Sequence, residues 1–282
     1  GKGVKNNGIK KNTNFKSGLR EQINLKLQKI ARHPRYYDKR KELVVQEIRS
    51  LGDIYSFWIE NPELRKALLL ENKKPETIRK MAREGIQAVH NGWYYLSQQG
   101  QFGNFTDYLS TDLLQRLNGL VARKDRRSGY FREPPNLLSH TSGDVTLNLE
   151  GYTPPSWEKV PAQVKELLEK IRESYKTDPL EAAILAHLGI GAIQPFFDGN
   201  KRCSRLIQNR ILYDAQMPPA TIQAGESKFY FGLLKKAFPA FRDGGVEGQR
   251  QFYDYCASKV NNGLDEILGD LQEEPAIKNT NH

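Results

Sequence analysis

Apolar residues recur at helical spacing along most of the chain. Because an α-helix turns once every 3.6 residues, apolar side chains three and four positions apart share one face. This spacing predicts helices over about residues 19–30, 39–59, 62–70, 75–96, 107–120, 158–175, 178–193, 201–215, 226–238 and 247–268. Residues 178–193 are apolar on nearly every side, which is typical of a helix at the centre of a fold.

Residues 124–157 break this helical pattern. They contain four prolines, at positions 134, 135, 154 and 155, and two short extended candidates, 129–132 and 144–149. The alternation of Val145, Leu147 and Leu149 suits a half-buried strand. We therefore expect a mainly α fold with a small β-hairpin at about residues 129–149.

Positive charge is concentrated at the N-terminus. Residues 1–50 hold 14 Lys/Arg and 4 Asp/Glu, which leaves 29 of each sign in the rest of the chain. Residues 1–15 are rich in Gly, Asn and Lys and predict a disordered basic tail. The arm is either a solvated tail or a contact for nucleic acid, and Phe15 as its one aromatic residue favours the tail.

The remaining composition restricts the setting of the protein. Two widely spaced cysteines, Cys203 and Cys256, make no disulfide framework and favour a reducing compartment. The five histidines show no zinc spacing, and no window approaches the roughly 18 apolar residues of a membrane span. We expect a cytoplasmic protein, or a translocated effector that acts in a cytosol, with no membrane partner.

The strongest chemical signal is a short loop between two predicted core helices. The loop has the sequence Gln194-Pro195-Phe196-Phe197-Asp198-Gly199-Asn200-Lys201-Arg202. A glycine-containing loop that leads into a helix N-terminus favours anion binding, because the first N–H groups are free and the helix dipole is positive there.

Charged side chains around this loop fit a polyphosphate. Arg202 and Arg205 are three residues apart, so both lie on one face of the first turn and offer guanidinium groups to phosphates. Asp198 stands at the loop edge, where a carboxylate could hold Mg²⁺ between two phosphates. These residues predict a site for a di- or triphosphate.

The loop resembles the signature of the Fic (Fido) family, His-Pro-Phe-x-(Asp/Glu)-Gly-Asn-Gly-Arg-x-x-Arg. Residues 194–205 match ten of its twelve positions, with the free positions counted. Gly151-Tyr152-Thr153-Pro154-Pro155 looks like the family's segment after its hairpin. The resemblance covers about residues 105–240 and implies a Fic-type helical core. It divides the chain into a tail (1–15), an N-terminal helical region (16–104), the core (105–240) and a C-terminal helix and tail (241–282).

The resemblance implies an activity and a role for individual residues. The usual family reaction moves AMP from ATP to a hydroxyl group of a target protein. Asp198 would ligate Mg²⁺, the hairpin at about 129–149 would align a target segment by strand pairing, and Tyr230 would lie near the adenine. The nucleotide would contact the remaining motif residues, Gly199, Asn200, Lys201, Arg202 and Arg205.

Gln194 is the first departure from the family pattern, because the family has its catalytic histidine there. That histidine takes the proton of the attacking hydroxyl, whereas a neutral amide cannot. His187, seven residues earlier, is expected to be a packed core histidine instead of a substitute. Three interpretations remain: a binding-only Fic domain, an engineered substitution, or weak chemistry without a side-chain base.

Lys201 is the second departure, since it stands where the family has glycine. The Asn-Lys-Arg variant also occurs in the Doc branch of the family, which phosphorylates its target. AMP transfer is therefore not the only activity that the resemblance implies.

Many Fic proteins carry an inhibitory helix with the pattern (Ser/Thr)-x-x-x-Glu-(Gly/Asn). Glu84-Gly85 matches its end without the Ser/Thr and lies on a predicted helix 110 residues before the motif. Our hypothesis is that Glu84 pairs with Arg205 and blocks the outer-phosphate site. The alternative is a surface glutamate that pairs with neighbouring basic residues.

Overall fold

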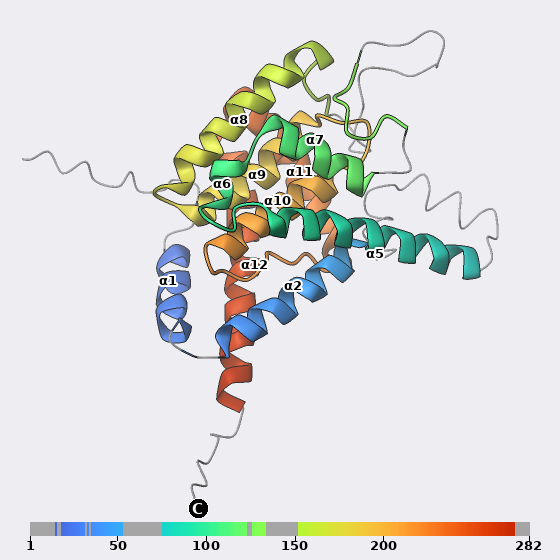
Figure 1. The fold of residues 1–282 in the computed structure, drawn as a ribbon. Coiled ribbons are helices and arrows are strands. Elements are labelled where there is room, and N and C mark those ends of the chain that lie inside the picture. The colour runs from blue at the N-terminus through green and yellow to red at the C-terminus, as the bar shows by residue number, and fades with distance from the viewer. Residues whose placement is uncertain are drawn as a thin grey trace, which may run out of the picture.

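The computed structural model describes residues 15, 18–31, 33, 35–52, 75–122, 126–133 and 152–273. Within these residues the chain forms ten α-helices and two 3₁₀ turns (Figure 1). The helices are α1 (Leu19–Ile30), α2 (Tyr36–Gly52), α5 (Pro75–Gln98), α6 (Phe105–Tyr108), α7 (Thr111–Val121), α8 (Val160–Tyr175), α9 (Pro179–Ile193), α10 (Asn200–Asp214), α11 (Ser227–Asp243) and α12 (Val246–Glu273). The 3₁₀ turns are η1 (Trp157–Lys159) and η2 (Ala224–Glu226).

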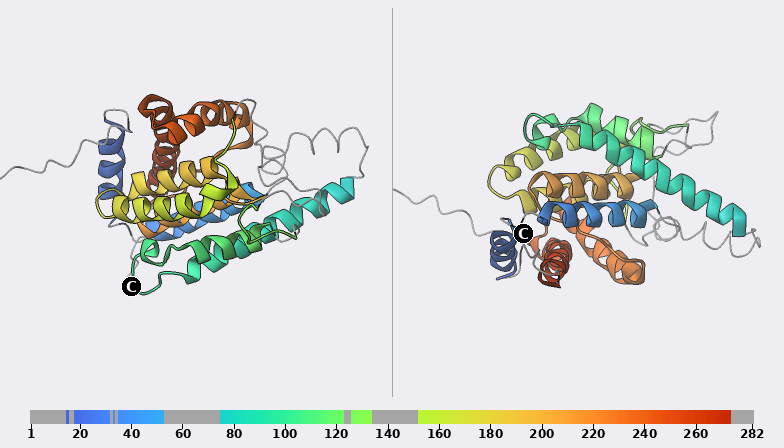
Figure 2. Two further views of the ribbon diagram at one scale, coloured as in Figure 1. Left: turned by 90° about the horizontal axis from the view of Figure 1, so that it is seen from above. Right: turned by 60° about the horizontal axis from the view of Figure 1, so that its bottom comes forward.

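The helices form three layers (Figure 2). α5 and α7 lie on one side, α8, α9 and α10 form the middle, and α11 and α12 lie on the other side. α9 packs against α8, α10, α11 and α12, which explains why its sequence is apolar all round. The middle layer therefore holds the two helices that flank the motif loop.

Glycines allow the close packing of α9. A β-carbon at Gly189 would stand 2.4 Å from Leu167 Cδ1 of α8, and one at Gly191 would stand 2.9 Å from Phe238 Cζ of α11. Real β-carbons do not approach other atoms so closely, so α8 and α11 occupy the space that side chains at these positions would need.

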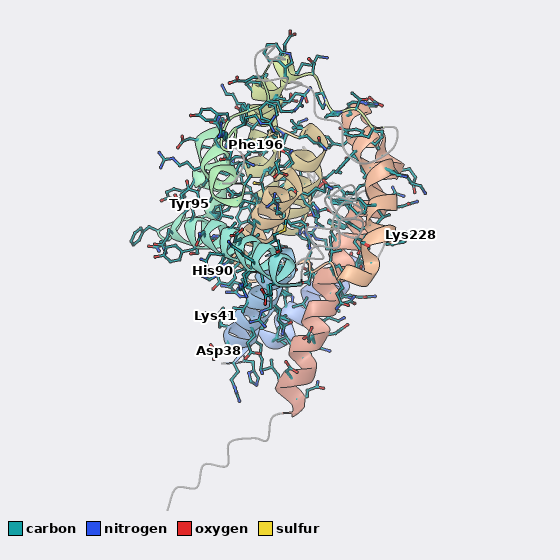
Figure 3. All side chains as sticks on the ribbon, turned by 90° about the vertical axis from the view of Figure 1, so that its right-hand side faces the viewer. Asp38, Lys41, His90, Tyr95, Phe196 and Lys228 are labelled. Atoms are coloured by element: carbon teal, nitrogen blue, oxygen red, sulfur yellow. The ribbon has the colours of Figure 1, made fainter. Side chains whose placement is uncertain are left out.

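The N-terminal helices pack on the remainder of the molecule. α1 lies along α12, and α2 packs against both α5 and α12. Lys41 of α2 and His90 of α5 are labelled in Figure 3, and they line a groove between their helices together with Val44, Ile48 and Trp93. Among the described residues, no helix is both long enough and apolar enough to cross a membrane.

The expectation of a mainly α fold is confirmed within the described residues. Every helix predicted from the spacing within the described ranges is present with small shifts in its ends, except the one predicted over 107–120. There, Leu109 and Ser110 are extended and separate α6 from α7. α11 runs past Pro239 to Asp243, where the sequence predicted an end at residue 238. The predicted helix at 62–70 and most of the predicted hairpin, residues 134–149, lie outside the described residues. Near the hairpin's start, Phe131 forms an isolated antiparallel bridge with Phe196.

Candidate nucleotide-binding site

The motif loop connects the C-terminus of α9 to the N-terminus of α10. Gln194 is the C-cap of α9 and Gly199 is the N-cap of α10, and both have left-handed backbone conformations, with φ of 48° and 77°. A β-carbon at Gly199 would also come within 3.2 Å of Ala122 Cβ and Asn118 Nδ2. The backbone conformation therefore favours glycine at position 199, and a side chain there would also be crowded.

Asn200 fixes the shape of the loop. Its Oδ1 accepts from the Phe196 N–H at 2.9 Å, and its Nδ2 donates to the Phe196 carbonyl at 2.8 Å. The Phe196 ring is fully buried and packs against the ring of Phe131, with centroids 5.4 Å apart. The asparagine of the motif therefore closes the loop on itself, while the phenylalanine anchors it in the core.

Asn118 of α7 is a site residue that the sequence interpretation missed. Its Nδ2 donates to the Asp198 carbonyl at 2.8 Å, and its Oδ1 accepts from the Gly129 N–H at 2.8 Å. The buried side chain thus joins the motif loop to the start of the predicted hairpin. The available signal was a polar residue directly after Leu117, inside the apolar stripe of α7.

Gln194 is buried, with 1% of its surface exposed. Its amide oxygen is enclosed and has no hydrogen-bond partner in the part of the chain that the structure describes. An enclosed acceptor without a partner is costly, and such atoms in native proteins commonly meet water or a ligand. The amide can accept a hydrogen bond from a hydroxyl group, although it cannot act as a base at neutral pH.

The first turn of α10 and the loop edge bring together the charges expected of a phosphate site. Arg202 lies near the Asp198 carboxylate, with Nη2 and Oδ2 3.2 Å apart, and its Nη1 donates to the Val121 carbonyl at 3.2 Å. The Asp198 side chain is 59% exposed. A single exposed carboxylate suits Mg²⁺, which takes most of its other ligands from phosphates and water. Among the described residues no group of three or more acidic, histidine or cysteine side chains could hold a metal ion by itself.

Arg205 faces in a different direction from Arg202. Its Nη2 lies 3.4 Å from Oε1 of Glu47 on α2, and both side chains are only 2% exposed. Asn209 also donates to this carboxylate oxygen, at 3.3 Å. Burial raises the pKa of Glu47 to about 7, while the Arg205 charge opposes this shift. The two arginines that the sequence placed on one phosphate face therefore have different partners here.

Tyr230 and His187 lie inside the core. The His187 Nε2 and the Tyr230 hydroxyl are 2.7 Å apart, and the His187 Nδ1 lies 2.8 Å from Oε1 of Gln208. Burial lowers the pKa of His187 to about 3, so the ring is neutral. The interpretation of His187 as a hydrogen-bonded core histidine is confirmed. Tyr230 is 1% exposed, and its proximity to an adenine stays a prediction.

Lys201 turns toward α11 and lies mostly inside the protein. Its ammonium nitrogen is 4.8 Å from the centre of the Phe231 ring, within the range of a cation–π contact, and the residue is 8% exposed. The residue that departs from the family glycine thus links the start of α10 to α11, next to Tyr230.

Glu84 lies on α5 and is half-buried. The carboxylate that the structure places on Arg205 is that of Glu47, so pairing of Glu84 with Arg205 stays a prediction. A complete match to the inhibitory pattern occurs elsewhere in the chain, at Ser56-Phe57-Trp58-Ile59-Glu60-Asn61, outside the described residues. The full pattern was therefore readable from the sequence, but at a different glutamate.

Known proteins with similar sequences share this region. The Fic/DOC family model matches residues 108–212. The "Protein adenylyltransferase Fic" of Drosophila willistoni is 30% identical over 158 residues, which are 54% of this chain and 30% of that protein. The "Protein adenylyltransferase fic-1" of Caenorhabditis elegans is 32% identical over 123 residues, 43% of this chain and 23% of that protein. The chain thus spans less than a third of the length of these relatives.

Solved structures share the fold more extensively. A Fic domain containing signaling protein from Bacteroides thetaiotaomicron has a TM-score of 0.66 and 20% identity, and the match covers 92% of this chain and 99% of that one. A Fic family protein from Desulfovibrio desulfuricans has a TM-score of 0.59 and 19% identity, with 91% and 75% covered. The shared fold agrees with the sequence match, and residues 108–212 of this chain form a Fic/DOC family domain.

Proposed function

We propose that this protein is an adenylyltransferase-like member of the Fic family, with activity limited by Gln194. The observation that carries the proposal is the motif loop at the N-terminus of α10, which Asn200 closes on Phe196. The loop leads directly into the N-terminus of a buried helix, where the helix dipole is positive, and such an end binds phosphate well. ATP is the nucleotide that the relatives' adenylyltransferase activity suggests.

In the proposed reaction, a target hydroxyl attacks the α-phosphorus of ATP. A new oxygen–phosphorus bond forms, the bond to pyrophosphate breaks, and the hydroxyl proton leaves to solvent. Arg202 and the α10 N-terminus would hold the phosphate chain. Asp198 would contribute one ligand to Mg²⁺, which offsets phosphate charge when bound.

Gln194 sets the expected rate. A general base at this position contributes about 10²–10⁴ in rate, and the amide supplies none of that. Its enclosed Oε1 can still accept a hydrogen bond from the attacking hydroxyl and so orient it. The proposal is therefore a nucleotide-binding domain with slow or absent transfer, not one with ordinary turnover.

Lys201 supports a second candidate, a Doc-like phosphotransferase. The side chain contacts Phe231 beside the loop, so it adds positive charge near the proposed phosphate site, where the family glycine adds none. A nucleotide bound in the reverse sense would present its γ-phosphorus to the target hydroxyl. A third candidate is a Fic-fold module that binds nucleotide or a partner without chemistry.

Gln194→His is the test of the proposal. The parent chain, Gln194→His and Gln194→Asn are incubated with Mg²⁺ and ATP that carries a label on either the α- or the γ-phosphate, together with cell-extract proteins. Gln194→Asn is the matched control, because asparagine tolerates the left-handed backbone and retains a neutral amide. We expect the histidine variant to transfer the α-label at least about 10²-fold faster than the other two.

Each alternative gives a different result. Transfer of the γ-label alone would identify a phosphotransferase. Calorimetric ATP binding without transfer of either label would identify a binding module. If none of the three proteins binds ATP with Mg²⁺, and Arg202→Ala behaves like the parent, the nucleotide site itself is wrong.

Inhibition by a glutamate is a separate part of the proposal. In the Gln194→His background, Glu84→Gly and Glu60→Gly are compared, since these residues match the inhibitory pattern in part and in full. An increase in α-label transfer by one variant alone identifies the inhibitory residue. Equal rates in both variants and in Gln194→His would remove this part of the proposal.

The proposals for the remaining partners of the protein are based on the sequence. We propose that a target protein pairs with the segment at about 129–149. Contact of the basic arm with nucleic acid is the weaker proposal, and a steep salt dependence of DNA or RNA binding, lost on deletion of residues 1–15, would support it.

A further inference from the structure

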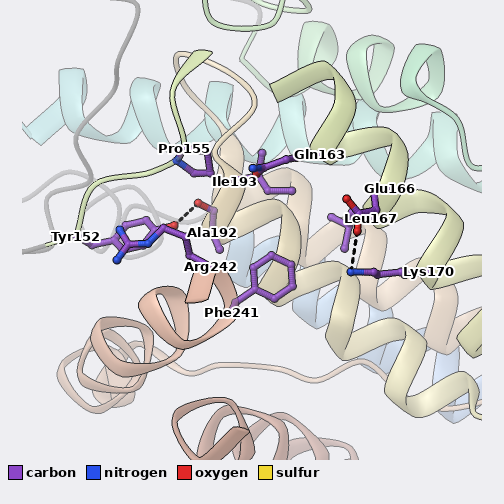
Figure 4. A pocket seen from close by; sticks show the side chains of 10 residues that line it. All are labelled: Tyr152, Pro155, Gln163, Glu166, Leu167, Lys170, Ala192, Ile193, Phe241 and Arg242. Carbon is purple, nitrogen blue, oxygen red and sulfur yellow. Dashed lines mark hydrogen bonds and ion pairs between the residues drawn. The ribbon is translucent and has the colours of Figure 1, made fainter. Parts of the chain in front are cut away.

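The C-terminus of α9 is bound by two side chains, one from the start of the predicted hairpin and one from the segment after it. The Tyr152 hydroxyl donates to the Ala192 carbonyl at 2.5 Å, as Figure 4 shows. Arg132 donates from Nη2 to the Ile193 carbonyl at 3.0 Å and from Nε to the Gln194 carbonyl at 2.5 Å. The backbone N–H of Arg132 also donates to the Pro195 carbonyl, at 2.9 Å.

Four consecutive carbonyl groups, those of residues 192–195, are therefore held by Tyr152 and Arg132. The carbonyls at a helix C-terminus lack intrahelical partners, and a buried cation is favourable there because the dipole is negative. The Arg132 side chain is 2% exposed, so its bonds form away from solvent. Charge-assisted bonds of this kind are stronger than neutral ones.

The held segment includes an unfavourable backbone conformation. Gln194 has φ 48° and ψ 66°, a left-handed conformation that a residue with a β-carbon seldom adopts. Such a conformation persists only where the surroundings fix it. The bonds of Arg132 to the carbonyls on both sides of this turn supply that constraint, and the direction of the residue-194 side chain follows from it.

We propose that Arg132 is a positioning residue for the motif: it fixes the backbone turn at residue 194 and thereby aims that side chain. The same guanidinium donates to the Pro155 carbonyl at 2.7 Å, which joins the segment after the hairpin to this turn. The role in catalysis rests on the proposed function, whereas the role in holding the loop does not.

Arg210 provides a matched control. It is also a buried arginine that binds backbone carbonyls at a helix C-terminus, with Nε on Leu96 at 3.0 Å and Nη2 on Gln99 at 2.8 Å. These carbonyls lie at the end of α5. Loss of the Arg210 hydrogen bonds should therefore loosen the end of α5 without loosening the motif loop. Arg132→Met and Arg210→Met thus each remove buried bonds to carbonyl groups, at two different places. Arg210→Met also removes an ion pair with Asp214 and a contact with the Phe105 ring.

The first measurement is amide hydrogen exchange, which needs no activity. We expect Arg132→Met to speed exchange of the Phe196 and neighbouring loop amides at least tenfold, Arg132→Lys to do so less, and Arg210→Met to leave the loop unchanged. Equal exchange in the loop of Arg132→Met and the parent would overturn the proposal. If Arg132→Met does not fold, Arg132→Lys decides alone: faster exchange of the loop amides than in the parent supports the proposal, and equal exchange overturns it.

The second measurement is the transfer rate in the Gln194→His background. Arg132→Met should lower the rate at saturating ATP at least tenfold while the Kd for ATP stays within twofold, and Arg132→Lys should recover part of the rate. Parallel losses of rate and affinity in Arg132→Met and Arg210→Met would show a general effect on folding and would overturn positioning. If Gln194→His itself is inactive, the proposed function fails, and the exchange measurement still decides the role of Arg132.

Discussion

His187 shows how a single buried residue makes the protein sensitive to acid. Both ring nitrogens have partners in the core, Tyr230 and Gln208, and burial lowers the histidine's pKa to about 3. A histidine with a lowered pKa in the folded state stabilises the protein above its unfolded pKa of about 6.5. This contribution is lost as the pH falls toward 3.

His187→Gln should remove this acid sensitivity. Glutamine keeps a hydrogen-bonding group but does not take up a proton. The stability of the variant protein therefore lacks this pH dependence. We expect the parent chain to lose on the order of 2–3 kcal/mol more than the variant between pH 7 and pH 4, measured by urea unfolding at both values. If the free energy of unfolding changes equally with pH in the two proteins, the folded protein takes up a proton on His187 as readily as the unfolded chain does.

Packing between elements explains the composition of α9. The helix is surrounded by α8, α10, α11 and α12, so its surface has no polar face. Gly189 lies where α8 comes closest, and Leu167 fills the position that a β-carbon would need. Gly189 therefore allows α8 to approach α9 closely, despite the low helix propensity of glycine.

Gly189→Ala should destabilise the protein by about 1–3 kcal/mol, because the added carbon would stand 2.4 Å from Leu167 Cδ1. Gly232→Ala in α11 is the control, since a β-carbon there meets nothing within 4 Å. That variant should be neutral or gain up to about 1 kcal/mol from helix propensity. Thermal unfolding of both variants tests the contact, and equal stabilities would refute it.

The helical pattern predicted most of this architecture, and the reasons for its failures are specific. It predicted α1, α5, α8 and α12 because their apolar stripes face a continuous core, and α9 because it is apolar on all sides. It ended α11 too early, because proline disfavours helix interiors but tertiary packing on α12 and α9 keeps this helix intact past Pro239. Pattern arguments respond to local preference and cannot weigh it against packing.

At the scale of the whole molecule, the N-terminal helices and the Fic/DOC domain share a core. Glu47 of α2 lies 158 residues from Arg205 in sequence and forms a buried ion pair with it. Asn209 binds the same carboxylate oxygen. A segment outside the family match therefore supplies the partner of a motif arginine, and changes at Glu47 should affect the domain.

Glu47→Gln should change the dependence of stability on pH between about 4.5 and 7. The raised pKa of about 7 means that the Glu47 contribution is fully present below the unfolded pKa of about 4.5 and is lost as pH rises through 7. Between pH 5 and pH 8 the parent should therefore lose stability relative to the variant. Urea unfolding at both pH values measures this difference, and a constant difference would show that Glu47 is ionised throughout the range.

Sequence and tertiary structure each determined a distinct part of this protein. The sequence by itself determined the helices, the central position of α9 and the motif loop at residues 194–202, because each depends on residues that are neighbours along the chain. It also carried the family signature, since that signature is local. Only the tertiary structure decided that Arg205 meets Glu47, that Asn118 meets Asp198 and that Arg132 binds the end of α9. These contacts join residues 62 to 158 positions apart, and they depend on how whole helices pack, which no local pattern of apolar and polar residues specifies.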